Sequence, residues 1–233
     1  MARAREARTA TPSRRKRPPK TTSSEGVAEP GPVVPFIGLT GGMGAGKSTA
    51  LAVLERLGAA VLSTDAIVHE LYEDEELREA LRERFGAQAV PGGRVDRAAV
   101  AARAFASEED RAWLEALLWP LVGGRVLAWL QRVRAGSERA CNGARPRAAV
   151  VEVPLLFEAG MEEVFDATIA VVAREELRRE RAARRGHALE DERAARQLAQ
   201  DAKAQRATFV VHNDGSELAL ERELSEILAK LAR

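Results

Sequence analysis

Cysteine and histidine are scarce in this chain of 233 residues. Cys141 is the single cysteine, and the histidines are His69, His187 and His212. One cysteine excludes an internal disulfide bond and fits a reducing compartment. The histidines are scattered and do not have the spacing of a metal-binding motif, which argues against a histidine-based metal site. The chemistry of the chain therefore depends on other residue types.

Long apolar runs are also missing. No run approaches the roughly 20 residues that span a bilayer. No apolar segment near the N-terminus has the pattern of a secretory signal. These absences predict a cytoplasmic location and no membrane partner.

Positive charge is concentrated at the N-terminus. Residues 1–30 hold eight Lys or Arg and three Glu, so their net charge is +5. The whole chain has a net charge of +1, which leaves −4 for the remainder. A mildly acidic remainder does not favour a nucleic-acid partner. Residues 1–33 are too polar to build a core, so we predict a disordered basic tail. Its Arg, Ser and Thr content also resembles an organelle transit peptide, and its basic cluster resembles a nuclear-import or nucleic-acid patch.

A glycine-rich motif follows the first apolar run. Residues 41–48 fit G-x-x-x-x-G-K-[ST] at every fixed position. In such a P-loop the backbone N–H groups surround phosphate oxygens, the lysine reaches the outer phosphates and the hydroxyl binds Mg²⁺. A glycine-rich turn before an ordinary helix is the alternative, but the preceding strand pattern and following helix pattern favour the P-loop. We therefore predict ATP and Mg²⁺ as cofactors, Lys47 as a catalytic residue, Ser48 as the metal ligand, and nucleotide binding by Gly42, Met43, Gly44, Ala45, Gly46, Lys47, Ser48 and Thr49.

Short apolar runs alternate with helical patterns along the remaining chain. Strands are predicted at residues 34–39, 59–62, 148–153, 167–172 and 208–211. This alternation is typical of an α/β fold in which helices cover both faces of a parallel five-stranded sheet. Together with the P-loop motif it predicts a P-loop NTPase or kinase fold, in a domain expected to span residues 34–233. Successive helical patterns without a strand, including a long helix interrupted at Pro120, predict a helical insertion at about 75–135.

Two acidic residues end predicted strands on the side of the P-loop. Asp65 could orient the phosphoryl acceptor, but it could equally be the N-cap of the following helix. Glu152 ends an apolar run as an acidic residue does in a Walker B strand. It could contact Mg²⁺ indirectly or simply face a neighbouring helix.

Four arginines recur at helical spacing near the C-terminal third. They are Arg174, Arg178, Arg181 and Arg185, which fall on one face of a helix. Most such arginines belong to a solvated face paired with glutamates. We expect one or two of them, with Arg181 as the catalytic candidate, to clamp phosphate from an Arg-rich lid at about 174–188.

Three tryptophans lie in the predicted insertion. They are Trp113, Trp119 and Trp129. Packing into a core is the expected role of each, and a stacking platform for adenine is the alternative.

Taken together, these motifs resemble the dephospho-CoA kinase family. The likeness covers residues 36 to about 231, and its most specific part is the string Val-Pro-Leu-Leu-Phe-Glu at 153–158. The remaining matches are the P-loop motif, Leu57-Gly58-Ala59, Asp65, Phe85-Gly86, Asp96-Arg97, Trp119-Pro120, the Arg-rich segment, Gln200 and Val210-Val211-His212-Asn213.

The resemblance implies transfer of the ATP γ-phosphoryl group to the ribose 3′-hydroxyl of dephospho-CoA, the small-molecule partner, which gives CoA and ADP. It implies that Asp65 orients or deprotonates this hydroxyl. It further implies that residues 85–133 bind the acceptor and that Asn213 lies near the adenine of ATP.

The chain departs from the family pattern at three places. Ser63-Thr64-Asp65 replaces the usual Asp-Ala-Asp, so Asp65 alone can carry the acidic role. Trp119-Pro120 replaces a usual His-Pro, and Ala207-Thr208 replaces a common Ala-Asp.

Two other functions are compatible with a P-loop. One is a kinase for a nucleoside, nucleotide or sugar acid, and the other is a nucleotide-dependent switch without an acceptor. A GTPase switch would normally show Asn-Lys-x-Asp and Asp-x-x-Gly, and neither string occurs. The long insertion and the Arg-rich segment favour enclosing an acceptor away from water, as a kinase requires.

Overall fold

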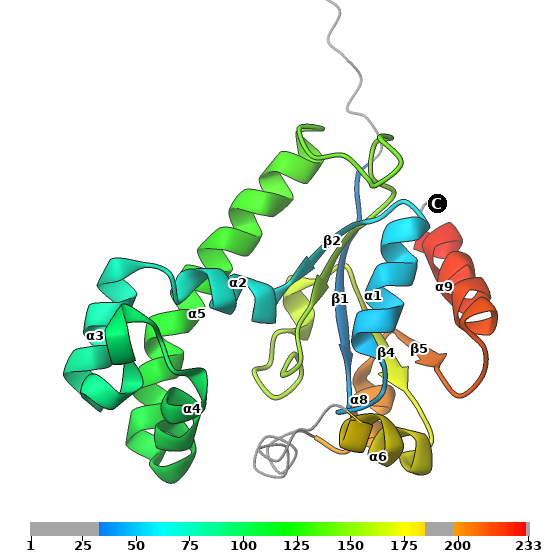
Figure 1. Ribbon diagram of the computed structural model, residues 1–233. Coiled ribbons are helices and arrows are strands. Elements are labelled where there is room, and N and C mark those ends of the chain that lie inside the picture. The colour runs from blue at the N-terminus through cyan, green and yellow to red at the C-terminus, as the bar shows by residue number, and fades with distance from the viewer. Residues whose placement is uncertain (1–32, 185–197, 232–233) are drawn as a thin grey trace, which may run out of the picture. The chain divides into compact units, whose positions relative to one another are not determined.

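Five short strands pair in parallel in the order β2-β3-β1-β4-β5 (Figure 1). The predicted parallel five-stranded sheet is therefore confirmed. The computed structural model describes residues 33–184 and 198–231, so most of the tail, Arg185, His187 and the end of the predicted lid lie outside the described residues. The strands are β1 (Phe36–Gly41), β2 (Ala60–Ser63), β3 (Ala149–Glu152), β4 (Ala167–Val172) and β5 (Phe209–His212).

The central strand β1 lies between β3 and β4, and its side chains alternate between two cores. Ile37 and Leu39 pack with α1 and α9 on one face, whereas Phe36 packs with α5 on the other. Successive side chains of a strand point to opposite faces, so a strand buried on both sides is apolar throughout. Helices therefore cover both faces of the sheet, as predicted.

The helices follow the predicted pattern with small shifts at their ends. Helix α2 begins at Thr64, because the chain turns immediately after β2. The helices are α1 (Lys47–Arg56), α2 (Thr64–Leu71), α3 (Glu75–Phe85), α4 (Arg97–Ala106), α5 (Glu108–Arg134), α6 (Glu175–Arg184), α8 (Gln200–Arg206) and α9 (Glu217–Leu231), with short 3-10 turns at Ala87–Ala89, Pro91–Gly93 and Glu162–Val164.

Helices α3, α4 and α5 form the segment where the insertion is predicted. Leu81, Phe85, Val100 and Leu118 from these helices are buried in one core, together with Ile67 of α2. In Figure 1, α2 lies between the sheet and α3. The insertion therefore shares one hydrophobic core with α2.

Helix α5 runs without a break through Pro120, contrary to the predicted interruption. Proline lacks an N–H group and removes the hydrogen bond to the carbonyl four residues earlier, which here belongs to Ala116. Ala116 and Pro120 are both exposed, so water can satisfy that carbonyl. Burial of Leu118 before the proline and of Trp129 after it holds the two halves of the helix in line.

By length and composition, α5 is also the one helix of the described part that could cross a membrane. This is weak evidence, because the core helix of a soluble protein can meet the same criterion. Trp129, Leu130 and Val133 of this helix are buried in the core on one face of the sheet.

The three tryptophans differ in their surroundings. Trp129 is buried, and Trp113 packs edge-to-face against Phe85 with ring centroids 5.4 Å apart. Trp119 is 55% exposed, so the expectation of core packing is wrong for this residue. It precedes exposed Pro120 and is not among the residues of the insertion core.

A buried ion pair lies beneath the end of β1. Lys203 of α8 is fully buried, and its Nζ lies 3.0 Å from Glu158 Oε1. The same Nζ donates to the Pro154 carbonyl at 2.7 Å, which also accepts from Thr40 Oγ1 at 3.3 Å. Glu158 Oε1 accepts in turn from the Leu198 amide at 2.8 Å. The pair therefore joins β1, the loop after β3 and the start of α8.

Burial lowers the pKa of Lys203 from its ordinary value of 10.5, and Glu158 partly offsets this shift. Removing one partner of a buried pair leaves the other charge uncompensated, which costs about 3–5 kcal/mol. Sequence patterns gave no sign of this pair, because Lys203 belongs to a short polar helix.

We expect Glu158→Gln to lower the free energy of unfolding by about 3–5 kcal/mol at neutral pH. The substitution also removes the interactions that raise the pKa of Lys203, so this pKa falls further. Between the folded pKa and 10.5 the unfolded state binds more protons, so stability should recover as the pH rises. Urea unfolding at intervals between about pH 7 and 9.5 measures both effects.

Glu217→Gln is the matched control, because Glu217 pairs with Arg56 at the surface. An exposed pair contributes at most about 1 kcal/mol, so this variant should remain near wild-type stability. A Glu158→Gln variant as stable as the control would contradict the assigned role of the buried pair.

Two glycines in the middle of α5 have open space around them. A Cβ atom on Gly123 or Gly124 would meet nothing within 4 Å. Glycine in a helix is less stable than alanine by about 1 kcal/mol. The double change Gly123→Ala, Gly124→Ala should therefore raise stability by about 1–2 kcal/mol, and thermal unfolding should shift upward by roughly 2–4 °C per kcal/mol.

Gly86→Ala is the comparison for this experiment. Gly86 has φ +84°, and its Cβ would lie 2.8 Å from Gln88 Oε1, so alanine should lower the midpoint. A lower midpoint for the double alanine variant would show that α5 requires these glycines.

Candidate active site

The P-loop connects the end of the central strand β1 to the start of α1. Gly46 is the N-cap of α1 with φ 93°, a left-handed conformation that favours glycine, and no side chain caps the helix. Within the described residues, the N–H groups of Gly44 and Gly46 donate to no protein acceptor. Unpaired N–H groups and the positive end of the helix dipole together form an anion-binding site.

Lys47 places its ammonium group against this loop. Its Nζ donates to the carbonyl oxygens of Gly41 at 3.2 Å and Gly42 at 3.3 Å. The positive charge is therefore held where the loop turns, beside the N–H groups that are left for an anion.

Ser48 is exposed at the start of α1, and its hydroxyl makes no hydrogen bond to the described residues. No group of three or more His, Cys, Asp or Glu in that part of the chain could hold a metal. Mg²⁺ commonly takes one or two protein ligands and completes its shell with phosphate oxygens and water. Ser48 beside a phosphate site fits such a shell, although the protein offers no metal cage.

Asp65 lies in the first turn of α2, directly after β2. It is exposed, and its carboxylate has no hydrogen bond or ion pair to the described residues. The N-cap of α2 is Ser63, so the alternative that Asp65 caps this helix is wrong. The start of the helix is held by Thr64, whose Oγ1 donates to the Glu152 carbonyl at 2.9 Å. Asp65 is thus on a fixed element with an unpaired carboxylate.

Glu152 ends β3 beside both neighbouring strands. It is opposite Leu39 of β1 and opposite Ser63 of β2. Its residue is 9% exposed, so it is buried at the edge of the sheet from which the P-loop and α2 leave. This position is compatible with an indirect contact to a metal, and that role stays a prediction.

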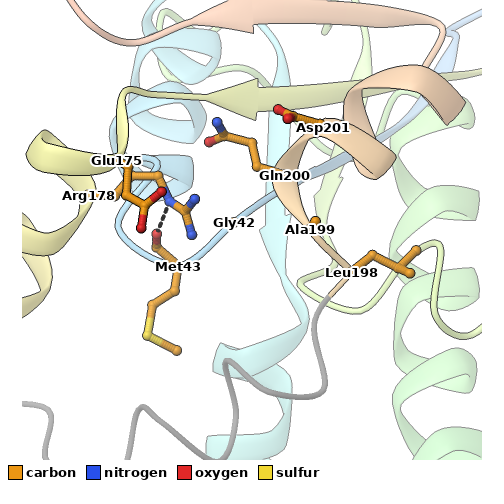
Figure 2. Close-up of a pocket in the computed structure, with 8 residues that line it drawn as sticks. All are labelled: Gly42, Met43, Glu175, Arg178, Leu198, Ala199, Gln200 and Asp201. Atoms are coloured by element: carbon orange, nitrogen blue, oxygen red, sulfur yellow. Dashed lines mark hydrogen bonds between the residues drawn. The ribbon is translucent and has the colours of Figure 1, made fainter.

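Two arginines of α6 contact the loop region. Arg178 Nε donates to the Met43 carbonyl at 2.8 Å, and Figure 2 shows its guanidinium beside Gly42 and Met43. Arg181 donates from one terminal nitrogen to the Asn213 carbonyl at 3.1 Å. Its other terminal nitrogen is buried without a hydrogen-bond partner among the described residues. A buried donor without a partner is unusual and fits a site for an anion.

Arg174 differs from these two arginines. Its side chain is 65% exposed, and its backbone N–H donates to Asp214 Oδ1 at 2.5 Å. Of the four arginines predicted on one helix face, the structure therefore brings Arg178 and Arg181 to the P-loop and leaves Arg174 in solvent.

Asn213 lies at the end of β5 and is 7% exposed. Its Nδ2 donates to the Ala45 carbonyl at 2.8 Å. The amide predicted to lie near adenine is thus bonded to the P-loop itself, a contact that no sequence pattern indicated.

A cavity of about 250 Å³ opens beside the loop (Figure 2). Gln200 forms part of its wall, and its side chain exchanges two hydrogen bonds with the backbone of Ala173, at 2.9 and 3.0 Å. The lining residues are Gly42, Met43, Glu175, Arg178, Leu198, Ala199, Gln200 and Asp201. Residues from the P-loop, α6 and α8 therefore meet around one space.

Comparison with known proteins gives one consistent result. The family model described as dephospho-CoA kinase matches residues 35–219. The dephospho-CoA kinase of Deinococcus radiodurans is 39% identical over 198 residues, which cover 84% of this chain and 91% of that protein. The dephospho-CoA kinase of Anaeromyxobacter dehalogenans is 41% identical over 201 residues, with the same two coverages.

Solved structures share the fold of this chain. A crystal structure of a protein from Thermus thermophilus superposes on this chain with a TM-score of 0.71 and is 37% identical in sequence. The match covers 85% of this chain and 98% of the Thermus chain. The dephospho-CoA kinase from Campylobacter jejuni has a TM-score of 0.60 at 24% identity, a likeness in fold. With the family model matching most of its length and relatives near 40% identical, the chain belongs to the dephospho-CoA kinase family.

Proposed function

We propose that this chain transfers the γ-phosphoryl group of ATP to the ribose 3′-hydroxyl of dephospho-CoA, which yields CoA and ADP. The observation that carries the proposal is the P-loop, with its unpaired N–H groups and Lys47, in a chain of this family. In the reaction a bond forms between the 3′-oxygen and the γ-phosphorus, and the bond from the γ-phosphorus to the β,γ-bridging oxygen breaks. The hydroxyl proton passes to the Asp65 carboxylate, and ADP is the leaving group.

ATP phosphates would bind to the backbone of residues 42–49. The N–H groups of Gly44 and Gly46 have no competing acceptor among the described residues, and Lys47 adds a positive charge at the same turn. Charge builds on the phosphoryl oxygens during transfer, so fixed donors at this position lower the barrier.

Mg²⁺ would bind at Ser48, together with phosphate oxygens and water. When bound, it neutralises charge on the phosphates and polarises the transferred group. The exposed hydroxyl of Ser48 and the absence of a carboxylate cage in the described part of the chain support this shared mode of binding.

Asp65 would orient the 3′-hydroxyl and accept its proton. Its carboxylate is exposed, is not paired with any described residue, and follows β2 on a helix anchored through Thr64 to β3. A positioned general base contributes roughly 10² to 10⁴ in rate. The family-typical acid two residues earlier is Ser63 here, so this role falls to Asp65 alone.

Arg181 would contact the transferred phosphoryl group, with Arg178 beside it. The unpartnered nitrogen of Arg181 lies 3.7 Å from the position of a Cβ on Gly46, next to the phosphate cradle. A guanidinium group fits phosphate oxygens well because its donors are planar and always charged.

The domain roles complete this picture. Residues about 75–135 would bind the acceptor, with exposed Trp119 in place of the usual histidine, and residues about 174–188 would form the lid. The basic tail of residues 1–33 would take no part in catalysis. The protein would act in the cytoplasm, without a nucleic-acid or membrane partner.

A panel of acceptors tests this function. With ATP and Mg²⁺, ADP release should be fastest with dephospho-CoA and slow with AMP, nucleosides and sugar acids. A preference for one of the latter would identify a different small-molecule kinase. ADP release that no acceptor accelerates would indicate a nucleotide-dependent switch.

Asp65→Asn should lower turnover at least about 100-fold while ATP binding, measured by calorimetry, stays near wild type. The reason is that the amide cannot accept the hydroxyl proton but keeps the shape of the side chain. Glu70→Gln, an exposed change on the same helix, should keep full turnover and serves as the control. Near-normal turnover of Asp65→Asn would remove Asp65 from the mechanism.

A further inference from the structure

Asn213 holds the backbone of the P-loop through a buried hydrogen bond. Its Nδ2 donates to the Ala45 carbonyl at 2.8 Å, and its own N–H pairs with the Val172 carbonyl at 2.8 Å as β5 ends. The side chain is therefore fixed by the sheet at one end and by the loop at the other.

The bond to Ala45 determines where the next N–H group points. The Ala45 carbonyl and the Gly46 N–H belong to one planar trans peptide, in which the two groups point in opposite directions. With the carbonyl held by Asn213, the Gly46 N–H is directed to the opposite side of the loop. That N–H has no protein acceptor among the described residues.

The close approach of Asn213 also explains why residue 46 is glycine. A Cβ on Gly46 would lie 2.0 Å from Asn213 Nδ2, and the φ of 93° is a conformation that other residues avoid. Gly46 and Asn213 therefore fit together as a pair that leaves no room for a side chain.

The same residue holds an arginine of the proposed lid. The backbone carbonyl of Asn213 accepts from Arg181 at 3.1 Å. The second terminal nitrogen of Arg181 is buried without a partner among the described residues and lies near Gly46. Asn213 therefore holds both the Gly46 N–H and the Arg181 guanidinium in place, and both groups suit one phosphate chain.

We propose that Asn213 is a positioning residue, which orients the Gly46 N–H and the Arg181 guanidinium toward the phosphates and does not recognise the adenine base. This inference rests on the proposed function, because it takes a nucleoside triphosphate as the ligand. One of the two N–H donors of the Asn213 side chain is used at the Ala45 carbonyl, and the residue is only 7% exposed, which favours contact with the loop over contact with the base.

Inorganic tripolyphosphate, which has phosphates but no base, separates the two roles. Asn213→Ala and Asn213→Leu both remove the donor to Ala45 without adding a charge, and we expect each to weaken binding of tripolyphosphate and of ATP by the same factor of about 10, the effect of one hydrogen bond. The turnover number should fall, the KM for dephospho-CoA should stay within about 2-fold, and the ratio of kcat/KM for ATP over GTP should not change.

Ser216→Ala is the matched control in the same turn. Ser216 Oγ accepts from the Ala219 N–H at 3.3 Å at the start of α9, so its loss should lower the thermal midpoint without changing tripolyphosphate affinity. If Asn213→Ala is too unstable to purify, Asn213→Leu keeps a side chain of similar size without adding a charge and allows the same comparison.

Two results would overturn the inference. One is a variant that binds tripolyphosphate as wild type does but binds ATP weakly. The other is a variant with a changed preference between ATP and GTP. Either result would assign Asn213 to recognition of the base. A wild-type chain that binds tripolyphosphate but does not phosphorylate dephospho-CoA would count against the proposed function alone, because the binding comparison needs no acceptor.

Discussion

A loop that binds phosphate must leave its N–H groups without protein partners, and its carbonyl groups must then be satisfied from elsewhere. The described structure does this with side chains that arrive from several elements. Lys47 donates to the carbonyls of Gly41 and Gly42, Arg178 to that of Met43, and Asn213 to that of Ala45. Since a trans peptide group carries its carbonyl and its N–H on opposite sides, the bonds to the Met43 and Ala45 carbonyls direct the N–H groups of Gly44 and Gly46 to the other side of the loop.

Position in the sheet explains how these side chains reach one loop. β1 lies between β3 and β4, so the ends of neighbouring strands surround the P-loop. In a parallel sheet the carboxyl ends of all strands lie at the same edge, and ligands bind at this edge in this class of fold. Asn213 follows β5, α6 follows β4 and α2 follows β2, so segments far apart in sequence meet at that edge.

The sequence predicted the features that local patterns determine. The P-loop, the five strands and most helices follow from glycine spacing, apolar runs and helical periodicity, which are short-range signals. The continuity of α5 could not be predicted in this way. By local rules Pro120 breaks a helix, and it is tolerated here because the Ala116 carbonyl faces water.

Such local patterns do not predict contacts between residues that are far apart in the sequence. The Lys203 and Glu158 pair joins residues 45 positions apart, and lysine is normally read as a surface residue. The bond from Asn213 to Ala45 spans 168 positions, so no local pattern indicated that this residue contacts the loop. The burial of Trp129 and the exposure of Trp119 likewise depend on the direction in which a long helix faces.

Helix α5 belongs to two cores at once. Leu118 packs with the insertion, whereas Trp129, Leu130 and Val133 cover one face of the sheet. A graft that exchanged the whole segment 75–135 with that of another kinase would strip this face of its cover and expose the sheet. An exchange of the insertion therefore has to end ahead of Trp129, so that the last turns of the helix stay with the sheet that they protect.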